Sequence, residues 1–388
     1  MKIGIDARFL THPQMGGFKT YTANLVTALA AVDNQNQYVL YLDRPSGDNE
    51  AVPQRPNVVA RVVPGNLPVV GMPWREQVEL VRQAAADGVD LFHAPCLTAP
   101  LRLRCPLVVT IHDMIWLLPH RLSRGGAWSF RRRLMDRYYR SVPRWAARRA
   151  AAVITVSRAA KDSIVEQLGL DARRVTVTYE APAPSFRRIA DAGQIEAARR
   201  RHGLESGFIL AIGSADPRKN LQTLVAAFAL LPQDLRARYR LVIVWTHSLL
   251  APTLNDTIQS LGLKERVRCL ERVSDADLVL LFNAASVFVF PSLYEGFGLP
   301  PLEAMACGTA VVASNNSSIP EVLGDAALLV DGEDRTSIAN AMARVLTDAD
   351  RRATLIERGL QRVGRFSWEK CARETLKAYE GALSAGRQ

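Results

Sequence analysis

Short runs of apolar, β-branched residues recur along this chain and alternate with stretches whose apolar residues repeat at helical spacing. Helical patterns lie at Thr20–Val32, Trp74–Asp87 and Lys161–Leu168. Such alternation predicts a parallel sheet with helices on both faces. The expected strands of the first half are Lys2–Asp6, Tyr38–Leu42, Val58–Val63, Leu91–His93, Leu107–Ile111, Ala152–Val156 and Val175–Thr178.

The pattern breaks at the proline-rich segment Tyr179–Ser185, which has no periodicity and is typical of a linker. The alternation then restarts, so the simplest prediction is an α/β protein with two doubly wound domains in tandem. Ligands of such sheets bind beyond the carboxyl ends of the strands, and we expect the active site in the cleft between facing domains. The expected strands of the second half are Phe208–Gly213, Leu241–Val244, Val267–Leu270, Val287–Phe290, Ala310–Ala313 and Ala327–Val330.

Composition agrees with a soluble globular protein. The chain has 388 residues, of which 48% are hydrophobic and 22% charged, enough for two domains. No apolar run reaches 18 residues and the first residues predict a strand, so neither a transmembrane helix nor a signal peptide is expected. The five cysteines are scattered, which supports neither a disulfide framework nor a zinc site. We therefore expect a cytoplasmic protein with reduced thiols.

The net charge of +11 is concentrated in one segment. Residues 120–150 hold ten arginines and a single acidic residue, Asp136, with tryptophan, tyrosine and phenylalanine interleaved. A solvated basic face is one interpretation. The other is a surface for anionic lipid headgroups, because basic aromatic helices bind such membranes. The sequence contains no recognisable nucleic-acid-binding module.

The most informative motif is Glu295-Gly-Phe-Gly-Leu-Pro-Pro-Leu-Glu303, which follows an apolar strand. It places one carboxylate on a strand-to-helix loop and a second in the first helical turn, with Pro300 or Pro301 at the first helical position. Its glycines permit close backbone approach, and the helix start offers N–H donors to a phosphate. Donors for phosphate beside carboxylates for hydroxyls predict a sugar-nucleotide site.

The segment Val287–Asp331, with Pro-Ser-Leu-Tyr-Glu-Gly-Phe-Gly-Leu-Pro, Glu-Ala-Met-Ala-Cys-Gly and Ile-Pro-Glu-Val, closely resembles the retaining glycosyltransferases of family four. Their Glu-x7-Glu motif matches at Glu295 and Glu303. The resemblance implies a GT-B fold: an acceptor-binding Rossmann-like domain at 1–185 and a nucleotide-sugar-binding one at 186–365. It also implies that the final helix, 366–388, crosses back to the first domain.

On the donor side the resemblance assigns roles to residues at strand ends. Lys219, with Arg218 as an alternative, contacts the diphosphate near Gly213, since Ser214 stands where many members have arginine. Glu303 binds the ribose and Glu295 the donor sugar. The remaining donor-binding residues are Phe297, Gly298 and Leu299 through their backbone, Val273 near the base, and Gly16 and Gly17 of the loop Met15–Tyr21.

The resemblance suggests that His112 touches the transferred sugar near the reacting carbon, so it joins Glu295, Lys219 and Arg218 as a catalytic candidate. The acceptor-side candidates, which also end strands, are His93, Asp113, Ser157 and Arg158.

No cofactor is expected. The pairs Asp275/Asp277 and Asp348/Asp350 resemble metal motifs, yet both fall at expected helix starts, where aspartate caps the helix. The resemblance likewise implies metal-independent transfer.

Within that family the chain resembles the mannosyl- and rhamnosyl-type enzymes of bacterial surface polysaccharides, including lipopolysaccharide, and this resemblance favours GDP-mannose as donor. A glycan or lipid-linked acceptor then suits a peripheral position at the inner membrane face. Two alternatives stay open: a nucleotide-sugar epimerase, and a non-catalytic partner that kept the fold. Ser214 and Trp245, which replaces a glycine common in relatives, are departures that favour the second alternative.

Overall fold

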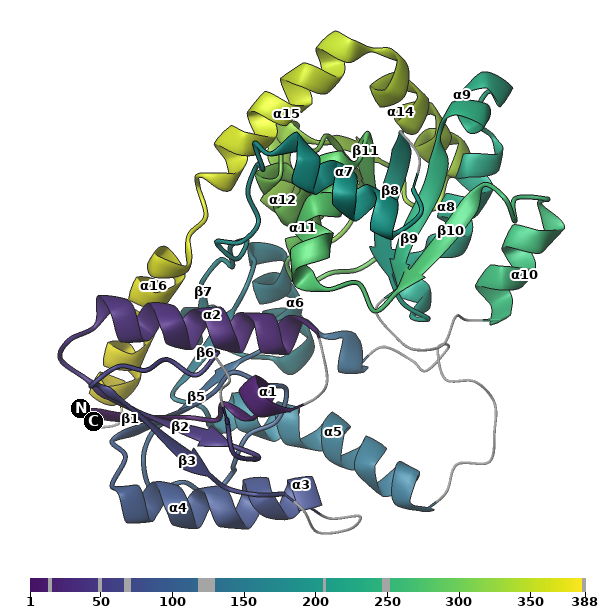
Figure 1. Ribbon diagram of the computed structural model, residues 1–388. Helices are drawn as coiled ribbons and strands as arrows, with labels where there is room; N and C mark the ends of the chain where they lie inside the picture. The colour runs from purple at the N-terminus through teal and green to yellow at the C-terminus, as the bar shows by residue number, and fades with distance from the viewer. Residues whose placement is uncertain are drawn as a thin grey trace. The chain divides into compact units, whose positions relative to one another are not determined.

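The chain folds into two compact units. The computed structural model describes residues 1–12, 16–47, 51–65, 71–117, 130–204, 207–245 and 252–385. The N-terminal unit comprises Met1–Glu180 and Ser367–Gln388, and the C-terminal unit comprises Ala181–Phe366 (Figure 1). The chain passes between the units after Glu180, inside the proline-rich segment, and returns after Phe366.

A parallel sheet forms the centre of the N-terminal unit, in the order β3-β2-β1-β4-β5-β6-β7. Each expected strand is present, within a residue or two at its ends. Buried β-branched runs flanked by turns suit a covered parallel sheet, whereas the edge strand β3 is largely exposed. The strands are β1 (Lys2–Ile5), β2 (Gln37–Leu42), β3 (Val58–Val62), β4 (Leu91–Ala94), β5 (Leu107–Thr110), β6 (Ala152–Thr155) and β7 (Val175–Val177).

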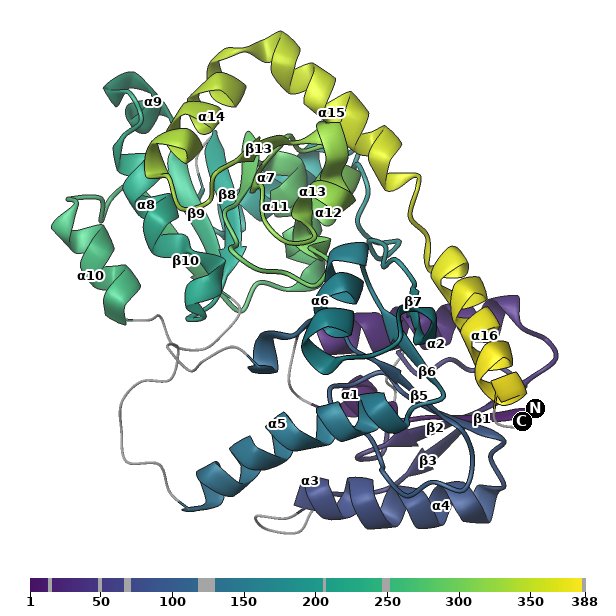
Figure 2. The same ribbon diagram turned by 180° about the vertical axis from the view of Figure 1, so that it is seen from behind.

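Helices cover both faces of this sheet. On one face α2 (Gly17–Val32) packs beside α16 (Trp368–Ala385), and both views show them adjacent (Figures 1 and 2). The other face is covered by α4 (Leu80–Asp87), α5 (Phe130–Arg149) and α6 (Arg158–Leu168), whose apolar residues join one core cluster with the sheet. Shorter elements are α1 (Arg8–Thr11), α3 (Gly71–Trp74), the π-helical turn η1 (Arg75–Glu79), and the 3₁₀ turns η2 (Ile115–Leu117) and η3 (Ala172–Arg174).

The C-terminal unit repeats the design with the sheet order β10-β9-β8-β11-β12-β13, again with every pair parallel. These strands also match the expected ones. They are β8 (Phe208–Gly213), β9 (Arg240–Trp245), β10 (Val267–Glu271), β11 (Val287–Phe290), β12 (Val311–Ser314) and β13 (Leu328–Val330).

One face of this second sheet packs in a core cluster with α8 (Leu221–Ala229), α9 (Gln233–Arg238), α10 (Pro252–Ser260), α14 (Arg335–Thr347) and the start of α15 (Ala349–Val363). The opposite side carries α7 (Ala192–Arg201), α11 (Asp275–Ala284) and α12 (Leu299–Ala306) (Figure 2). Short turns are η4 (Pro217–Lys219), α13 (Ile319–Leu323) and η5 (Gly324–Ala326).

Both sheets reverse their strand order at an inner pair, β1/β4 in the first and β8/β11 in the second. The loops after two such strands diverge and leave a crevice at the carboxyl ends, which is where ligands of doubly wound sheets bind. A ligand site is therefore expected at the residues that follow β8 and β11.

Candidate active site

Two charged residues far apart in sequence meet at the β8/β11 reversal. Lys219 ends the turn η4 that follows β8, and Glu295 lies in the loop after β11. Lys219 Nζ is 2.5 Å from Glu295 Oε1, and the two side chains are 21% and 14% exposed. The lysine also lies over the ring of Phe290, 5.3 Å from its centroid. The structure thus joins a cation that suits phosphate to a carboxylate that suits sugar hydroxyls.

Arg218 points elsewhere in the same turn. Its guanidinium pairs with Asp216 (Nη2 to Oδ2, 2.6 Å) and donates to the carbonyl oxygen of Tyr294 at 3.2 Å. The Arg218 carbonyl oxygen accepts from the Leu293 N–H at 2.8 Å. Arg218 therefore ties the loop after β8 to the loop after β11 in this structure, while Lys219 faces Glu295.

Asn220 is a residue that the sequence analysis missed. It has a left-handed backbone (φ 54°), which asparagine tolerates better than most residues. Its side-chain amide donates to the carbonyl oxygens of Pro291, at 3.1 Å, and Gly332, at 2.6 Å. Asn220 thereby fastens together the loops that follow three strands.

Serines hold the Glu295 loop from a second side. Ser292 donates to Glu295 Oε1 at 2.6 Å, so the carboxylate has a fixed orientation. The Ser317 hydroxyl accepts from the Glu295 N–H at 2.9 Å and donates to its carbonyl oxygen at 2.7 Å. Ser318 donates to the carbonyl oxygen of Phe297 at 2.9 Å. The sequence analysis missed the roles of these serines. Ser317 and Ser318 follow a different strand, β12, whereas Ser292 lies in the Glu295 loop itself.

The helix α12 begins at Leu299, after Gly298 in a left-handed conformation (φ 98°). A Cβ at Gly298 would lie 2.7 Å from Ile319 Cδ1, so the position has no room for a side chain. This start corrects two expectations. Leu299, not a proline, takes the first helical position, and Glu303 falls in the second turn, where its side chain is largely buried. Both prolines still fit, because first-turn residues need no N–H partner.

Gly213 ends β8 and lies against α8, because a Cβ there would be only 2.6 Å from Leu221 Cδ1. Val273 follows β10, at the sheet edge, and Ser274 caps α11 by accepting from the Asp277 N–H at 3.1 Å. The structure thus places Val273 two strands away from β8.

The two departures from the family pattern have structural roles. Trp245 ends β9 and is buried in the core cluster of the C-terminal unit. The Ser214 hydroxyl accepts from the Asp216 N–H at 3.3 Å.

Both Asp-x-Asp pairs lie at helix starts, where Asp277 and Asp348 have protein partners. Asp277 pairs with Arg201 at 2.5 Å and with His202 at 2.9 Å, and these partners lower its pKa. Asp348 caps α15 by accepting from the Arg351 N–H at 2.8 Å. Within the described residues, no group of three histidine, cysteine or acidic side chains is arranged to hold a metal ion.

In the N-terminal unit, His112 follows β5 and is enclosed on several sides. Its Nδ1 is 3.1 Å from Glu180 Oε1, and its Nε2 is 3.3 Å from the Pro95 carbonyl oxygen. The rings of Tyr21 and Phe18 meet it edge-on, with centroid distances of 4.5 and 5.1 Å. Glu180 was missed because it lies in the segment interpreted as a linker.

His93 is fully buried at the end of β4. Its Nδ1 is 2.7 Å from the Tyr379 hydroxyl on α16, and its Nε2 is 2.8 Å from Thr110 Oγ1. Burial, with a smaller contribution from His112, lowers its pKa to about 3. In this structure His93 fastens the terminal helix to the sheet.

The other acceptor-side candidates lie at local turns. Asp113 accepts from the Ile115 N–H at 3.0 Å. Ser157 caps α6 by accepting from the Ala160 N–H at 3.0 Å, and the exposed Arg158 is the first residue of that helix.

The expected glycine loop is instead the start of a helix. Gly16 caps α2 with φ 139°, and Gly17 is its first residue, so the helix begins earlier than the predicted Thr20. Met15 lies outside the described residues. Both glycines are exposed, and a Cβ at either would meet nothing within 4 Å.

A buried ionic network follows β1. Asp6 pairs with Arg8 (Oδ2 to Nη2, 2.6 Å) and Arg75 (Oδ1 to Nη1, 3.1 Å), and Arg8 reaches Glu76 at 2.8 Å. Burial alone would raise the pKa of Asp6, but the two arginines outweigh it and the pKa is lowered. Tyr138 of α5 donates to Glu76 at 2.7 Å, so the network also anchors the basic helix.

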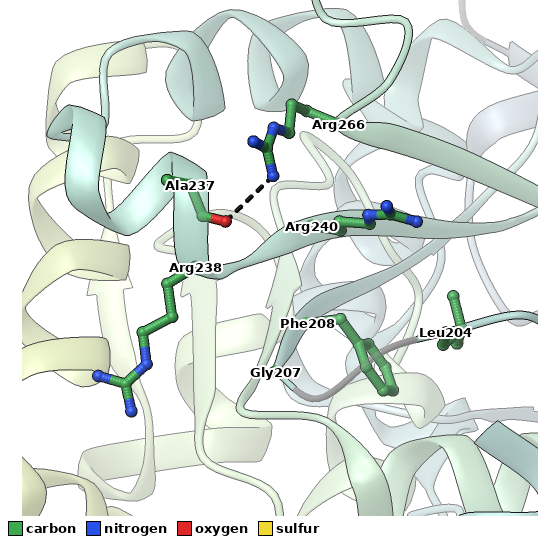
Figure 3. A pocket seen from close by; sticks show the side chains of 7 residues that line it. All are labelled: Leu204, Gly207, Phe208, Ala237, Arg238, Arg240 and Arg266. Atoms are coloured by element: carbon green, nitrogen blue, oxygen red, sulfur yellow. Dashed lines mark hydrogen bonds between the residues drawn. The ribbon is translucent and has the colours of Figure 1, made fainter. Parts of the chain in front are cut away.

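A small hollow lies at the opposite, amino-terminal edge of the second sheet (Figure 3). Its volume of about 20 Å³ has room for about one water molecule. Arg266 donates there to the Ala237 carbonyl oxygen at 3.0 Å, while Arg238 points away. Its size and location separate it from the residues that follow β8 and β11.

Comparisons with known proteins agree with this geometry. The model described as "Glycosyltransferase Family 4" matches residues 15–181, and "Glycosyl transferases group 1" matches residues 194–362. "O-antigen chain mannosyltransferase B" of Escherichia coli is 33% identical over 75% of this chain and 74% of its own length. "Serotype-specific mannosyltransferase WbdA" of Escherichia coli is 32% identical over 62% of this chain, but that match spans only 30% of the longer relative.

Among solved structures, Anabaena Alr3699/HepE in complex with UDP-glucose has a TM-score of 0.75 at 20% identity, covering 98% of this chain and 99% of that one. The chain belongs to the GT-B glycosyltransferases of the group 1 and family 4 models. It is accordingly a sugar-transferring enzyme.

In the described part of the chain, no helix is both long and apolar enough to span a bilayer.

Proposed function

We propose that this glycosyltransferase moves a hexose, with mannose favoured, from GDP-mannose to a glycan or lipid-linked acceptor during bacterial surface polysaccharide synthesis, with retention of configuration. The main structural support for this proposal is the contact between Lys219 and Glu295 at the β8/β11 reversal. The mannosyltransferase names of the relatives support the choice of sugar and pathway.

The donor would lie along the carboxyl edge of the second sheet. Lys219, assisted by Arg218, would neutralise the diphosphate near Gly213. Glu295 would accept hydrogen bonds from the sugar, with backbone N–H groups of Phe297–Leu299 nearby. Glu303 would bind the ribose and Val273 would lie near the base.

The transfer step needs no protein nucleophile in this proposal. The bond from the sugar's anomeric carbon to the leaving phosphate oxygen breaks while the bond to the acceptor oxygen forms on the same face. The acceptor's hydroxyl proton passes to the leaving phosphate. Lys219 stabilises the negative charge that develops on the diphosphate, the electrostatic contribution that usually dominates. His112 positions the sugar, and no metal or other cofactor takes part.

A thermal-shift panel with UDP, GDP, ADP and their common sugars tests donor binding. A ligand that binds only the folded state stabilises it by about 2.7 kcal/mol at a hundredfold excess over Kd. We expect the GDP-mannose shift to be lost in Lys219→Met and Glu295→Gln and kept in Lys264→Met, an exposed lysine of the same unit. If Lys219→Met and Glu295→Gln keep the GDP-mannose shift, the donor does not bind at these two residues.

Product analysis tests the chemistry. Incubation with GDP-mannose and octyl α-mannoside, followed by NMR of the new anomeric centre, should give an α-linked product. A β-linked product would contradict retention, and donor conversion without an acceptor would favour the epimerase.

The acceptor is proposed to be lipid-linked because α5 presents a basic aromatic face. Trp145 and Leu134, which are 56% and 44% exposed, share this face with the exposed Arg137, Arg144 and Arg148. The part of the basic segment before residue 130 lies outside the described residues.

Liposome flotation tests this face. We expect binding to vesicles with anionic phosphatidylglycerol that weakens with salt and falls in Trp145→Ser with Arg144→Ser. Trp74, which is 43% exposed and belongs to α3 rather than to α5, supplies the control Trp74→Ser. Equal binding to neutral phosphatidylcholine vesicles would refute an electrostatic membrane contact.

A further inference from the structure

The contact between His112 and Glu180 joins residues 68 positions apart. His112 follows β5, whereas Glu180 is the last residue of the N-terminal unit before the chain passes to the other unit. The His112 and Glu180 side chains are 13% and 6% exposed, so little water competes for the contact.

Hydrogen-bond chemistry constrains the protons of this pair. A carboxylate and a carbonyl oxygen only accept, and a neutral imidazole has a single N–H to donate. Glu180 faces Nδ1 at 3.1 Å and the Pro95 carbonyl faces Nε2 at 3.3 Å. The closer acceptor is a carboxylate and makes the stronger bond, so Nδ1 is the nitrogen that carries the single proton of a neutral ring.

Packing fixes the plane of the ring as well. Tyr21 and Phe18, both on α2, meet His112 edge-on at interplanar angles of 88° and 86°. Tyr21 is itself held, since its hydroxyl lies 3.3 Å from Thr110 Oγ1 and its ring contacts Trp368. A ring that cannot rotate presents the same nitrogen at all times.

We infer that Glu180 is a positioning residue that sets the tautomer and orientation of His112. It holds the proton on Nδ1 and fixes the direction in which Nε2 points, toward the Pro95 carbonyl oxygen. The consequence for catalysis rests on the proposed function, in which His112 positions the transferred sugar, whereas the assignment of the proton does not.

The tautomer can be measured without any substrate. Long-range ¹H–¹⁵N NMR of the full chain at pH 8, with the His112→Asn spectrum identifying the signal, reports which ring nitrogen carries the proton. We expect a protonated Nδ1 in the wild type and loss of that preference in Glu180→Ala. Glu180→Gln, whose amide oxygen can still accept, should restore much of it. Glu369→Ala changes an exposed glutamate of the same unit and should leave the signal unchanged.

Kinetics with GDP-mannose and octyl α-mannoside form the second measurement. Partners that orient metal-ligating histidines change activity by about 10–100-fold. By analogy we expect Glu180→Ala to lose kcat within that range, with a smaller change in the donor KM. An unprotonated Nδ1 in the wild type, or a tautomer unchanged in Glu180→Ala, would overturn the inference. A tautomer change as expected in a protein that fails to use GDP-mannose would uphold the inference and contradict the proposed donor instead.

Discussion

Replacing Gly213 with alanine would push a methyl group into the side chain of Leu221. A Cβ at this position would lie 2.6 Å from Leu221 Cδ1, 3.0 Å from Cγ and 3.1 Å from Cδ2. Leu221 is buried at the start of α8, so it cannot simply turn into solvent. Overpacking of this kind costs roughly 1–3 kcal/mol. For a unit of this size we expect the melting temperature to fall by about 2–12 °C.

A double-mutant cycle isolates this clash. Leu221→Ala alone should cost about 2–5 kcal/mol through the cavity it leaves. Gly213→Ala combined with Leu221→Ala should cost about 1–3 kcal/mol less than the two single effects together, because the new methyl group enters that cavity. Urea unfolding followed by circular dichroism measures each free energy. Gly17→Ala is the matched control, since nothing lies within 4 Å of its Cβ, and it should be neutral or slightly stabilising.

Additive free energies in the cycle, or a Gly213→Ala variant within about 0.5 kcal/mol of the wild type, would refute the reasoning. The cycle also separates packing from donor binding. If Leu221→Ala keeps the GDP-mannose thermal shift, and the double variant is as stable as Leu221→Ala yet loses that shift, the absence of a side chain at Gly213 serves the donor directly.

Three further predictions concern buried polar groups. Arg75→Met should destabilise the N-terminal unit by about 3–5 kcal/mol in urea unfolding, because the buried Asp6 carboxylate then loses one of its two arginine partners. Arg82→Met removes an exposed arginine and is the control; an equal loss of stability in both variants would contradict this prediction. His93 has a pKa of about 3 in the folded state, below its ordinary value of 6.5, so between these two pH values the folded state binds fewer protons than the unfolded state. The free energy of unfolding should therefore fall by up to about 1.4 kcal/mol for each pH unit as the pH drops through that window. His93→Gln should flatten this slope in urea titrations, and an unchanged slope would count against it. Asn220→Ala removes two side-chain hydrogen bonds at a residue with left-handed backbone and should lower the free energy of unfolding by roughly 2 kcal/mol. A melting curve like that of the wild type would show that these hydrogen bonds are dispensable.

The sheets were predictable because their signal is local. Runs such as Val287–Phe290 are continuous, apolar and bounded by turns, which is what a strand covered on both faces requires. The same locality placed Lys219 and Glu295 after strands, and parallel strands bring their carboxyl ends to one edge. Their 2.5 Å contact follows from that topology.

The missed residues act across long sequence separations or through backbone geometry. Glu180 reaches His112 only after β5 and β7 join one sheet, and no spacing rule encodes that pairing. Asn220 matters because of a positive φ that its neighbours impose. The early start of α2 at Gly17 escaped because consecutive glycines usually indicate a turn, and the packing of Tyr21 and Leu25 overrides their low helix propensity.

If Lys219 and Glu295 bind the donor as proposed, their pairing would give the site a built-in filter. A ligand that offered only phosphate would take the lysine and leave the carboxylate, 14% exposed, without its counter-charge, which is a costly state for a desolvated group. A sugar nucleotide compensates both residues together, with negative charge for one and hydroxyl donors for the other. Inorganic phosphate and free nucleotides, abundant in any cell, would therefore compete poorly against the complete donor.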